Sequence, residues 1–208
     1  MSRNKLVAFV LFFWAMSCEP ATPIDRQAVK EEMKSREIRK ISSSEITLRA
    51  QELSKNIYDQ LSIQHQQALS SADVAIENCK IDALPGVQAA KSSGIQILRW
   101  TQKALNTPEQ RNSLENNMFE AYEYALAHQL PMTSSLSELD PSTLRYWVPI
   151  QMQEQCTSCH GKKTEIPQEI QRKLAARYTH FTSVDFEVGQ LMGLWEIDLP
   201  KEVVIKSF

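Results

Sequence analysis

The 208-residue chain is poor in glycine and cysteine, with five residues of the first kind and four of the second. So few glycines exclude a collagen-like repeat, and so few cysteines exclude a disulfide scaffold. The formal net charge of −2 lacks the basic excess that a nucleic-acid partner requires, so we expect no such partner. The remaining composition, 42% hydrophobic and 23% charged, is typical of one ordinary globular domain with appendages.

The chain begins with an apolar segment that is too short to cross a bilayer. Leu6–Met16 holds eleven residues, whereas a membrane-spanning helix needs about 20. Arg3 and Lys5 precede this segment, and Ala15-Met16-Ser17 supplies the small residues that a signal peptidase recognises. The pattern predicts a signal peptide over residues 1–17, a tether over 18–42 and a single domain over 43–208. We expect an exported, periplasmic protein.

Cys18 follows the predicted signal peptide directly, as the acylated cysteine does in bacterial lipoproteins. Such sites usually carry Leu three residues before the cysteine, and here that residue is Ala15. Two outcomes stay open at this position. Either a lipid on Cys18 tethers the protein to a membrane surface, or ordinary cleavage occurs after Ser17.

The chemistry of the chain centres on the run Cys156-Thr157-Ser158-Cys159-His160, which has the pattern of covalent c-type haem attachment. Two thiols one helical turn apart can each add to one of the two vinyl groups of a porphyrin. The imidazole that follows can then bind the iron from one side. We predict one covalent haem c, held by Cys156 and Cys159, with His160 as the proximal ligand. Gly161 would let the backbone turn away from the porphyrin edge.

Two other interpretations of the paired cysteines suit this sequence less well. A redox-active dithiol usually lies at a strand-to-helix junction of a βαβ unit, and no such unit is recognisable here. A zinc site requires a second pair of Cys or His ligands at short spacing. The remaining cysteines, Cys18 and Cys79, stand alone in the sequence.

A long amphipathic helix is predicted from Ser43 to just before Leu84-Pro85-Gly86. Ser42–Ser44 supply N-cap candidates, and Glu45 places an acid in the first turn. Apolar residues recur every three or four positions along one face of this helix.

Cys79 lies on that apolar face, whose later half consists of small residues that leave room for a flat group. This thiol is either a buried core residue or the sixth ligand of the haem iron. His128, at the end of a later predicted helix, and His180 are rival candidates. A histidine at a helix end is more often a core or capping residue, and the residues alone leave the choice open.

Strand-like alternation appears at Ile95–Thr101 and Leu144–Met152. In the second segment Pro149 indicates an edge strand or the end of a strand. Arg99 either pairs with a haem propionate or is an exposed strand residue. Phe186–Leu199 is predicted as two strand pieces interrupted by glycines.

Two further helices are predicted between these strands. One begins at Thr107 and buries a face that runs from Leu114 to His128, and the other covers Pro167–Tyr178. The order of elements favours an α+β domain, with an antiparallel sheet flanked by helices and a long N-terminal helix.

Several segments besides the haem motif form an ordered set: Ala75–Cys79, Gly94, Asn106–Pro108, Trp147–Ile150 and Gly189–Gly193. Together with the motif they resemble the bacterial c-type haem sensor domain with a PAS-like fold, over roughly residues 43–199. The resemblance implies a PAS-like sheet and one haem c. It also implies that Cys79 is the axial ligand opposite His160.

The last strand departs from the pattern of that family. The family usually has Gly-Asp-Leu-Arg-Gly, whereas this chain has Gly189-Gln190-Leu191-Met192-Gly193. The Asp and Arg, which could hold a propionate, have no counterpart here. Met192 becomes a further candidate for the iron, although a packed core methionine is the alternative.

Two functions agree with these observations. In a redox or small-ligand sensor, a thiolate opposite His stabilises ferric iron, and reduction weakens the iron–sulfur bond so that a diatomic gas can bind. A periplasmic electron-transfer cytochrome would keep both axial ligands in both states. We expect no enzymatic activity, because no acid–base constellation typical of a peroxidase is recognisable. The expected partner is a redox or signalling protein.

Overall fold

The structure is a computed structural model that describes residues 25–35, 40–69, 76, 81–101, 113–178 and 184–208. The chain divides into two units, 1–40 and 41–208. The first contains helix α1 (Arg26–Ser35), which has no buried residue. No helix within the described ranges is long and apolar enough to cross a membrane. The second unit contains the sheet and the haem-attachment motif.

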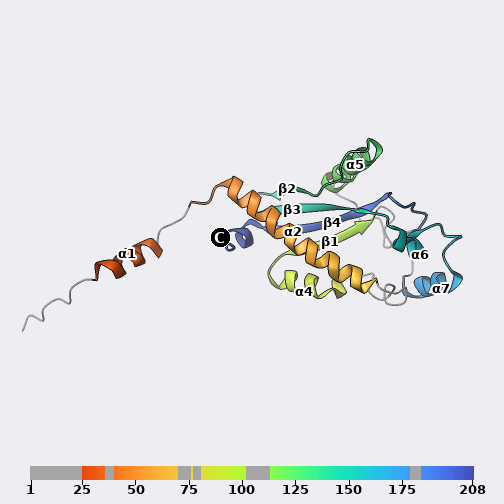
Figure 1. The fold of residues 1–208 in the computed structure, drawn as a ribbon, viewed down its shortest axis with the longest axis horizontal. Coiled ribbons are helices and arrows are strands. Elements are labelled where there is room, and N and C mark those ends of the chain that lie inside the picture. The colour runs from red at the N-terminus through yellow and green to blue at the C-terminus, as the bar shows by residue number, and fades with distance from the viewer. Residues whose placement is uncertain (1–24, 36–39, 70–75, 77–80, 102–112, 179–183) are drawn as a thin grey trace, which may run out of the picture. The chain divides into compact units, whose positions relative to one another are not determined.

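A four-stranded antiparallel sheet forms the centre of the second unit (Figure 1). Its strands are β1 (Gln96–Thr101), β2 (Ser135–Asp140), β3 (Thr143–Gln151) and β4 (Leu191–Pro200). They lie in the order β1-β4-β3-β2, so the last strand of the chain is a central strand. Helices cover this sheet, which confirms the predicted α+β class with a PAS-like arrangement.

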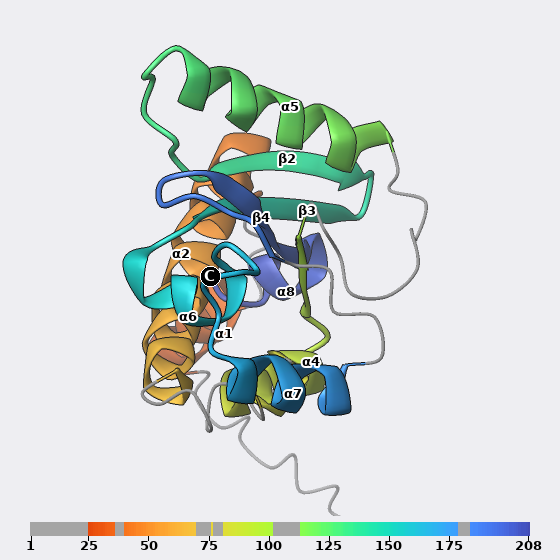
Figure 2. The ribbon, with the colours of Figure 1, turned by 90° about the vertical axis from the view of Figure 1, so that its right-hand side faces the viewer.

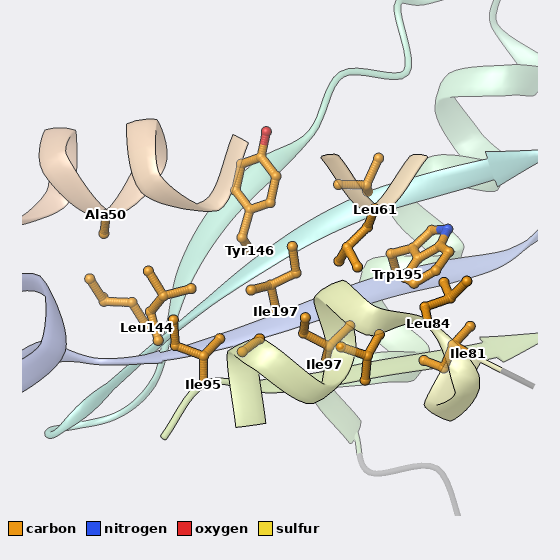
Figure 3. Packing of buried hydrophobic residues seen from close by; sticks show 14 of the residues in the cluster. Ala50, Leu61, Ile81, Leu84, Ile95, Ile97, Leu144, Tyr146, Trp195 and Ile197 are labelled. Atoms are coloured by element: carbon orange, nitrogen blue, oxygen red, sulfur yellow. The ribbon is translucent and has the colours of Figure 1, made fainter. Parts of the chain in front are cut away.

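One face of the sheet carries the main hydrophobic core, beneath helix α2 (Ser43–Ala68). Alternate residues of the central strands point to this side, as the sequence pattern predicts. Figure 3 shows Ala50 and Leu61 of α2 facing Tyr146, Trp195 and Ile197 of the sheet. Helices α4 (Pro85–Ser92) and α8 (Lys201–Ile205) contribute to the same core.

Helix α2 begins where the sequence predicts and ends earlier than predicted. The Ser42 hydroxyl accepts from the Glu45 backbone N–H, and the Glu45 carboxylate accepts from the Ser42 backbone N–H, which completes a capping box. The helix ends at Ala68, so one continuous helix to Leu84 is wrong. Serines 70 and 71 follow in the sequence, and serine competes with the helix for backbone hydrogen bonds.

Helix α4 is not predicted by the sequence, because a proline after a helical pattern indicates a stop. Pro85 instead occupies the first turn of α4, where a missing N–H costs nothing. A 3-10 turn, η1 (Ile81–Ala83), precedes it. Gly94, with φ of 78°, then turns the chain into β1.

The opposite face of the sheet is covered by α5 (Ser113–Ala127), which lies along β2 in Figure 2. Phe119 and Tyr122 are its buried residues and pack with Trp147 and Leu194. The predicted buried face of this helix, from Leu114 to His128, is therefore partly wrong, because Ala121 and His128 on that face are exposed.

Four charged side chains meet between α5 and the sheet. Arg145 Nε lies 2.5 Å from Asp198 Oδ1, and Arg145 Nη1 lies 2.7 Å from Glu196 Oε2 and 3.4 Å from Glu115 Oε1. The Trp100 indole N–H donates to the other Glu196 oxygen at 2.5 Å. Burial raises the pKa of Glu196 to about 7, although the Arg145 cation opposes this shift. We call Arg145, Glu196, Asp198 and Glu115 the buried ionic cluster.

Strand β3 is a central strand and not an edge strand. Pro149, however, lies in the part of β3 that pairs with only one described strand. The pairing of β2 with β3 ends at Ser135 and Trp147, whereas β3 continues beside β4 to Gln151. On the β2 side Pro149 therefore has no described strand as its neighbour, as is usual for a proline in a sheet. The sequence does not predict β2, because its residues are mostly polar.

Strand β4 is continuous from Leu191 to Pro200, which corrects the two predicted pieces. Gly189 has φ of 88° and forms the turn before the strand. Gly193 lies within the strand and approaches β1 closely. A Cβ on Gly193 would lie 1.9 Å from the Trp100 carbonyl oxygen.

His65 of α2 lies against the sheet and bonds to Arg99. The Arg99 guanidinium donates to His65 Nε2 at 2.9 Å and stacks over the Trp195 ring. Arg99 is therefore half-buried and not an exposed strand residue. Burial lowers the pKa of His65 to about 4, and the Arg99 cation adds to the shift.

His65→Gln should make the protein more resistant to acid. Between pH 6.5 and 4 the unfolded His65 binds a proton and the folded one does not, so the contribution of His65 to the free energy of unfolding falls as the pH falls. The free energy of unfolding of the variant, minus that of the unaltered protein, should be about 2–3 kcal/mol higher at pH 4.5 than at pH 7. Urea unfolding at both pH values measures this gain. His128→Gln, at an exposed histidine, is the matched control and should show no such difference.

Candidate haem-attachment site

The Cys-x-x-Cys-His motif lies directly beyond the end of β3. It comprises a 3-10 turn, η2 (Glu154–Cys156), and one helical turn, α6 (Thr157–His160). Main-chain bonds of 2.8 Å join Met152 N to Gln190 O and Gly189 N to Met152 O, so the end of β3 is fixed to the turn before β4. The Thr157 hydroxyl donates to the Glu154 carbonyl at 2.7 Å and closes the first turn.

The three predicted haem-binding residues share one side of this turn. Cys156, Cys159 and His160 are all half-buried, whereas Thr157 and Ser158 between them are exposed. Residues three and four positions apart lie on the same face of a helical turn. The two cysteines are not joined in a disulfide. Both thiols and the imidazole can therefore meet one flat group on the sheltered side.

Gly161 is required by close packing rather than by an unusual backbone angle. Its φ is −68°, which any residue can adopt. A Cβ at this position would lie 2.6 Å from the carbonyl oxygen of Thr157. The predicted turn after His160 thus depends on the absence of a side chain.

A second segment, residues 185–186, runs alongside the motif and is not predicted by the sequence. Asp185 N donates to Gly161 O at 2.8 Å, and Phe186 N donates to His160 O at 3.1 Å. The Asp185 carboxylate accepts from Lys163 N at 3.0 Å. Most of these bonds use main-chain atoms, so residue types give little signal of them. We call Asp185 and Phe186 the strap.

Two methionines line the sheltered side near the first cysteine. Met152, Phe186 and Met192 are buried together, and Cys156 packs against them. Met192, a candidate iron ligand from the sequence, thus lies in a small apolar cluster beside the motif. An apolar cluster of this kind suits the face of a porphyrin.

The other candidate ligands have different outcomes. His128 is exposed, its Nδ1 donates to the Tyr124 carbonyl at 2.8 Å, and its ring stacks on Tyr124. It is the capping residue that the sequence offered as the alternative. Cys79, His180 and Cys18 lie outside the described residues. Among the described residues, no group of three or more His, Cys, Asp or Glu side chains could hold a metal ion.

Helix α7 (Gln168–Arg177) follows the motif in the chain and leads to Tyr178. It packs next to α6, and both lie at the same end of the unit in Figures 1 and 2. The Tyr178 hydroxyl, just after α7, donates to the Ile76 carbonyl at 2.8 Å. Cys79 follows Ile76 by three residues in the sequence and lies outside the described residues.

Comparison with known proteins gives one family and one similar structure. The family model described as Tll0287-like matches residues 25–200. The crystal structure of the cyanobacterial heme-protein Tll0287 is 23% identical in sequence, with a TM-score of 0.52. The match covers 72% of this chain and 95% of that one. The search of curated proteins found no match.

Proposed function

Since the chain belongs to the Tll0287-like family, we propose that it is a haem protein in which Cys156 and Cys159 hold one haem covalently. His160 binds the iron from the same side. One observation carries this proposal: both thiols and the imidazole occupy the sheltered face of one turn. The similar crystal structure is that of a heme-protein, which agrees with this assignment.

The residues present fit such a group. The two thiols and the imidazole belong to one turn, and Met152, Phe186 and Met192 supply apolar surface next to Cys156. Bound here, a haem supplies an iron that changes between the ferric and ferrous states. The protein supplies the attachment, the orientation and the electrostatic surroundings.

The proposed sixth ligand is Cys79. Its support is the resemblance to the haem sensor family, together with the bond from Tyr178, just after the helix beside the motif, to Ile76, three residues before Cys79 in the sequence. A thiolate from Cys79 together with the imidazole of His160 would favour ferric iron, because the negative sulfur stabilises the higher charge. Cys79 would hold ferrous iron less tightly, so a small ligand could then compete with it.

This chemistry favours a redox or small-ligand sensor without enzymatic activity. In our proposal the protein is exported to the periplasm, with Cys18 as a lipid attachment site. It passes its signal to a protein partner by contact. An electron-transfer cytochrome is the alternative function, in which both axial ligands stay bound in both oxidation states.

Covalent attachment is tested by mass spectrometry. The protein made in a host that installs haem c, then stripped with acidic acetone, should retain the mass of one haem. Cys156→Ala combined with Cys159→Ala should lose that mass completely. A polypeptide mass without haem in the unaltered protein would refute the proposal.

Replacing Cys79 with Ala should change the ferric spectrum from low-spin thiolate–imidazole to a form that lacks the thiolate. Optical and electron-spin spectra record this change. Met192→Leu is the matched control and should leave both spectra unaltered, because Met192 packs in the apolar cluster. If the two variants exchanged these results, Met192 and not Cys79 would be the ligand.

Carbon monoxide separates the two functions. A sensor should bind the gas rapidly once reduced, and Cys79→Ala should bind it faster still. An electron carrier would stay inert to the gas and exchange electrons quickly. Stopped-flow absorbance after reduction measures both rates.

A further inference from the structure

The strap holds the two carbonyl groups that end the haem motif. Asp185 N bonds to Gly161 O at 2.8 Å, and Phe186 N bonds to His160 O at 3.1 Å. These bonds come from a segment 25 residues further along the chain, immediately before the turn into β4. The backbone on the C-terminal side of His160 is thus fixed from outside its own helical turn.

Asp185 has a backbone conformation that few residues adopt. Its φ is 60°, in the left-handed region where Gly, Asn and Asp are enriched. In this conformation its N–H reaches Gly161 while its carboxylate accepts from Lys163 N at 3.0 Å. Asp185 therefore bonds to the chain after His160 at two places, the carbonyl of Gly161 and the N–H of Lys163. An unusual backbone angle that the surroundings enforce is often found at a functional site.

Phe186 connects the same strap to the other end of the motif. Its side chain is 3% exposed and packs with Met152 and Met192, in the cluster that Cys156 joins. The strap thus contacts the motif at its first cysteine through a side chain and at His160 through the backbone.

We propose that Asp185 is a positioning residue for the proximal ligand. It holds the main chain of residues 160–163 so that the His160 imidazole already points at the iron when the bond forms. Pre-ordering removes conformational freedom that the iron–nitrogen bond would otherwise have to fix. The inference rests on the proposed function, because it requires iron on His160.

The test measures the strength of the iron–imidazole bond by acid titration. As pH falls, a proton displaces the His160 imidazole from the iron, and the absorption spectrum reports the change. The experiment uses the haem-loaded Cys79→Ala protein, so that His160 alone is titrated. Asp185→Gly keeps the left-handed backbone and removes the acceptor for Lys163. It should weaken the bond by about threefold to tenfold, which raises the midpoint by about half to one pH unit.

Asp185→Asn tests whether the side-chain oxygen is the important group. Asparagine also tolerates the left-handed region, and its amide oxygen can accept from Lys163. This variant should therefore keep the original midpoint. A midpoint raised as far as that of Asp185→Gly would overturn the role of the acceptor.

Gln129→Gly is the matched control. Gln129, after α5, has φ of 56° and is the other non-glycine residue of the described chain with a positive φ. It should leave the acid midpoint unchanged.

Mass spectrometry should show complete haem in every variant. An unshifted midpoint in fully loaded Asp185→Gly would show that Asp185 is only structural. Absence of haem from the unaltered protein would instead refute the proposed function.

Discussion

Replacing Arg145 with Met should lower the free energy of unfolding by about 3–5 kcal/mol at pH 8. Arg145 is the cation of the buried ionic cluster, where Asp198 binds it through two oxygens at 2.5 and 2.7 Å and Glu196 through one. Without it, the carboxyl groups of Glu196, 1% exposed, and Asp198, 6% exposed, stay buried and lose the cation that pairs with them. Denaturant titration at fixed ionic strength measures the loss.

The same loss should shrink as the pH falls. Burial raises the pKa of Glu196 to about 7 while Arg145 opposes the shift, so removing Arg145 raises this pKa further and a proton can replace the missing cation as the pH falls. In the unaltered protein, proton uptake by folded Glu196 makes unfolding harder as pH falls from 7 to 4.5. Glu196→Gln should abolish this rise in the free energy of unfolding between pH 7 and 4.5.

Two comparisons test the explanation from charge. Adding Glu196→Gln and Asp198→Asn to Arg145→Met should recover part of the stability, since the two most deeply buried carboxylates of the cluster are then neutral amides. Lys55→Met removes one partner of the exposed Lys55–Asp59 pair and should change the stability little, because solvent screens an exposed pair. If Arg145→Met lost no more stability than Lys55→Met, the buried ionic cluster would not stabilise the fold as we expect.

Gly193→Ala should destabilise the protein by more than about 4 kcal/mol, or prevent folding. The new Cβ would lie 1.9 Å from the Trp100 carbonyl oxygen and 2.8 Å from the Thr101 Cα. Both atoms belong to the backbone of β1, so no side-chain rotation can relieve the overlap. The end of β1 would have to leave β4, with which it pairs at Thr101 and Gly193. Thermal unfolding followed by circular dichroism measures the effect.

Gly94→Ala provides the comparison for that experiment. Gly94 has φ of 78°, and a Cβ added there would have no atom of the described residues within 4 Å beyond its chain neighbours. Its cost should come from the backbone angle alone, at about 1 kcal/mol. Equal destabilisation by the two variants would show that the contact with β1 is unimportant.

The elements predicted correctly are those whose signals lie close together in the sequence. The start of α2 follows from Ser42 and Glu45, which cap one another over three residues. The two faces of β3 follow from a strict alternation of side chains. The elements that were missed depend on distant partners. Strand β2 is mostly polar and is a strand because β3 pairs with it.

The candidate site shows the same division. The cysteine and histidine spacing predicts which residues share a face, because one helical turn brings them together. The strap lies 25 residues further along and bonds to main-chain atoms, which every residue type carries. The buried ionic cluster was missed for a similar reason. The alternation of β3 predicts on which face of the sheet Arg145 lies, but not which acidic side chains it meets there.

The central place of β4 has a consequence for the sequence of events in folding. Residues 191–200 insert between β1 and β3, and among the described strands no other one hydrogen-bonds to β1. A nascent chain that stops before Leu191 can form only the β2–β3 hairpin of this sheet. The cysteines at 156 and 159 leave the ribosome before this last strand, so their thiols precede the finished sheet. If these thiols take a haem as proposed, attachment can precede the insertion of the final strand, which then completes the domain.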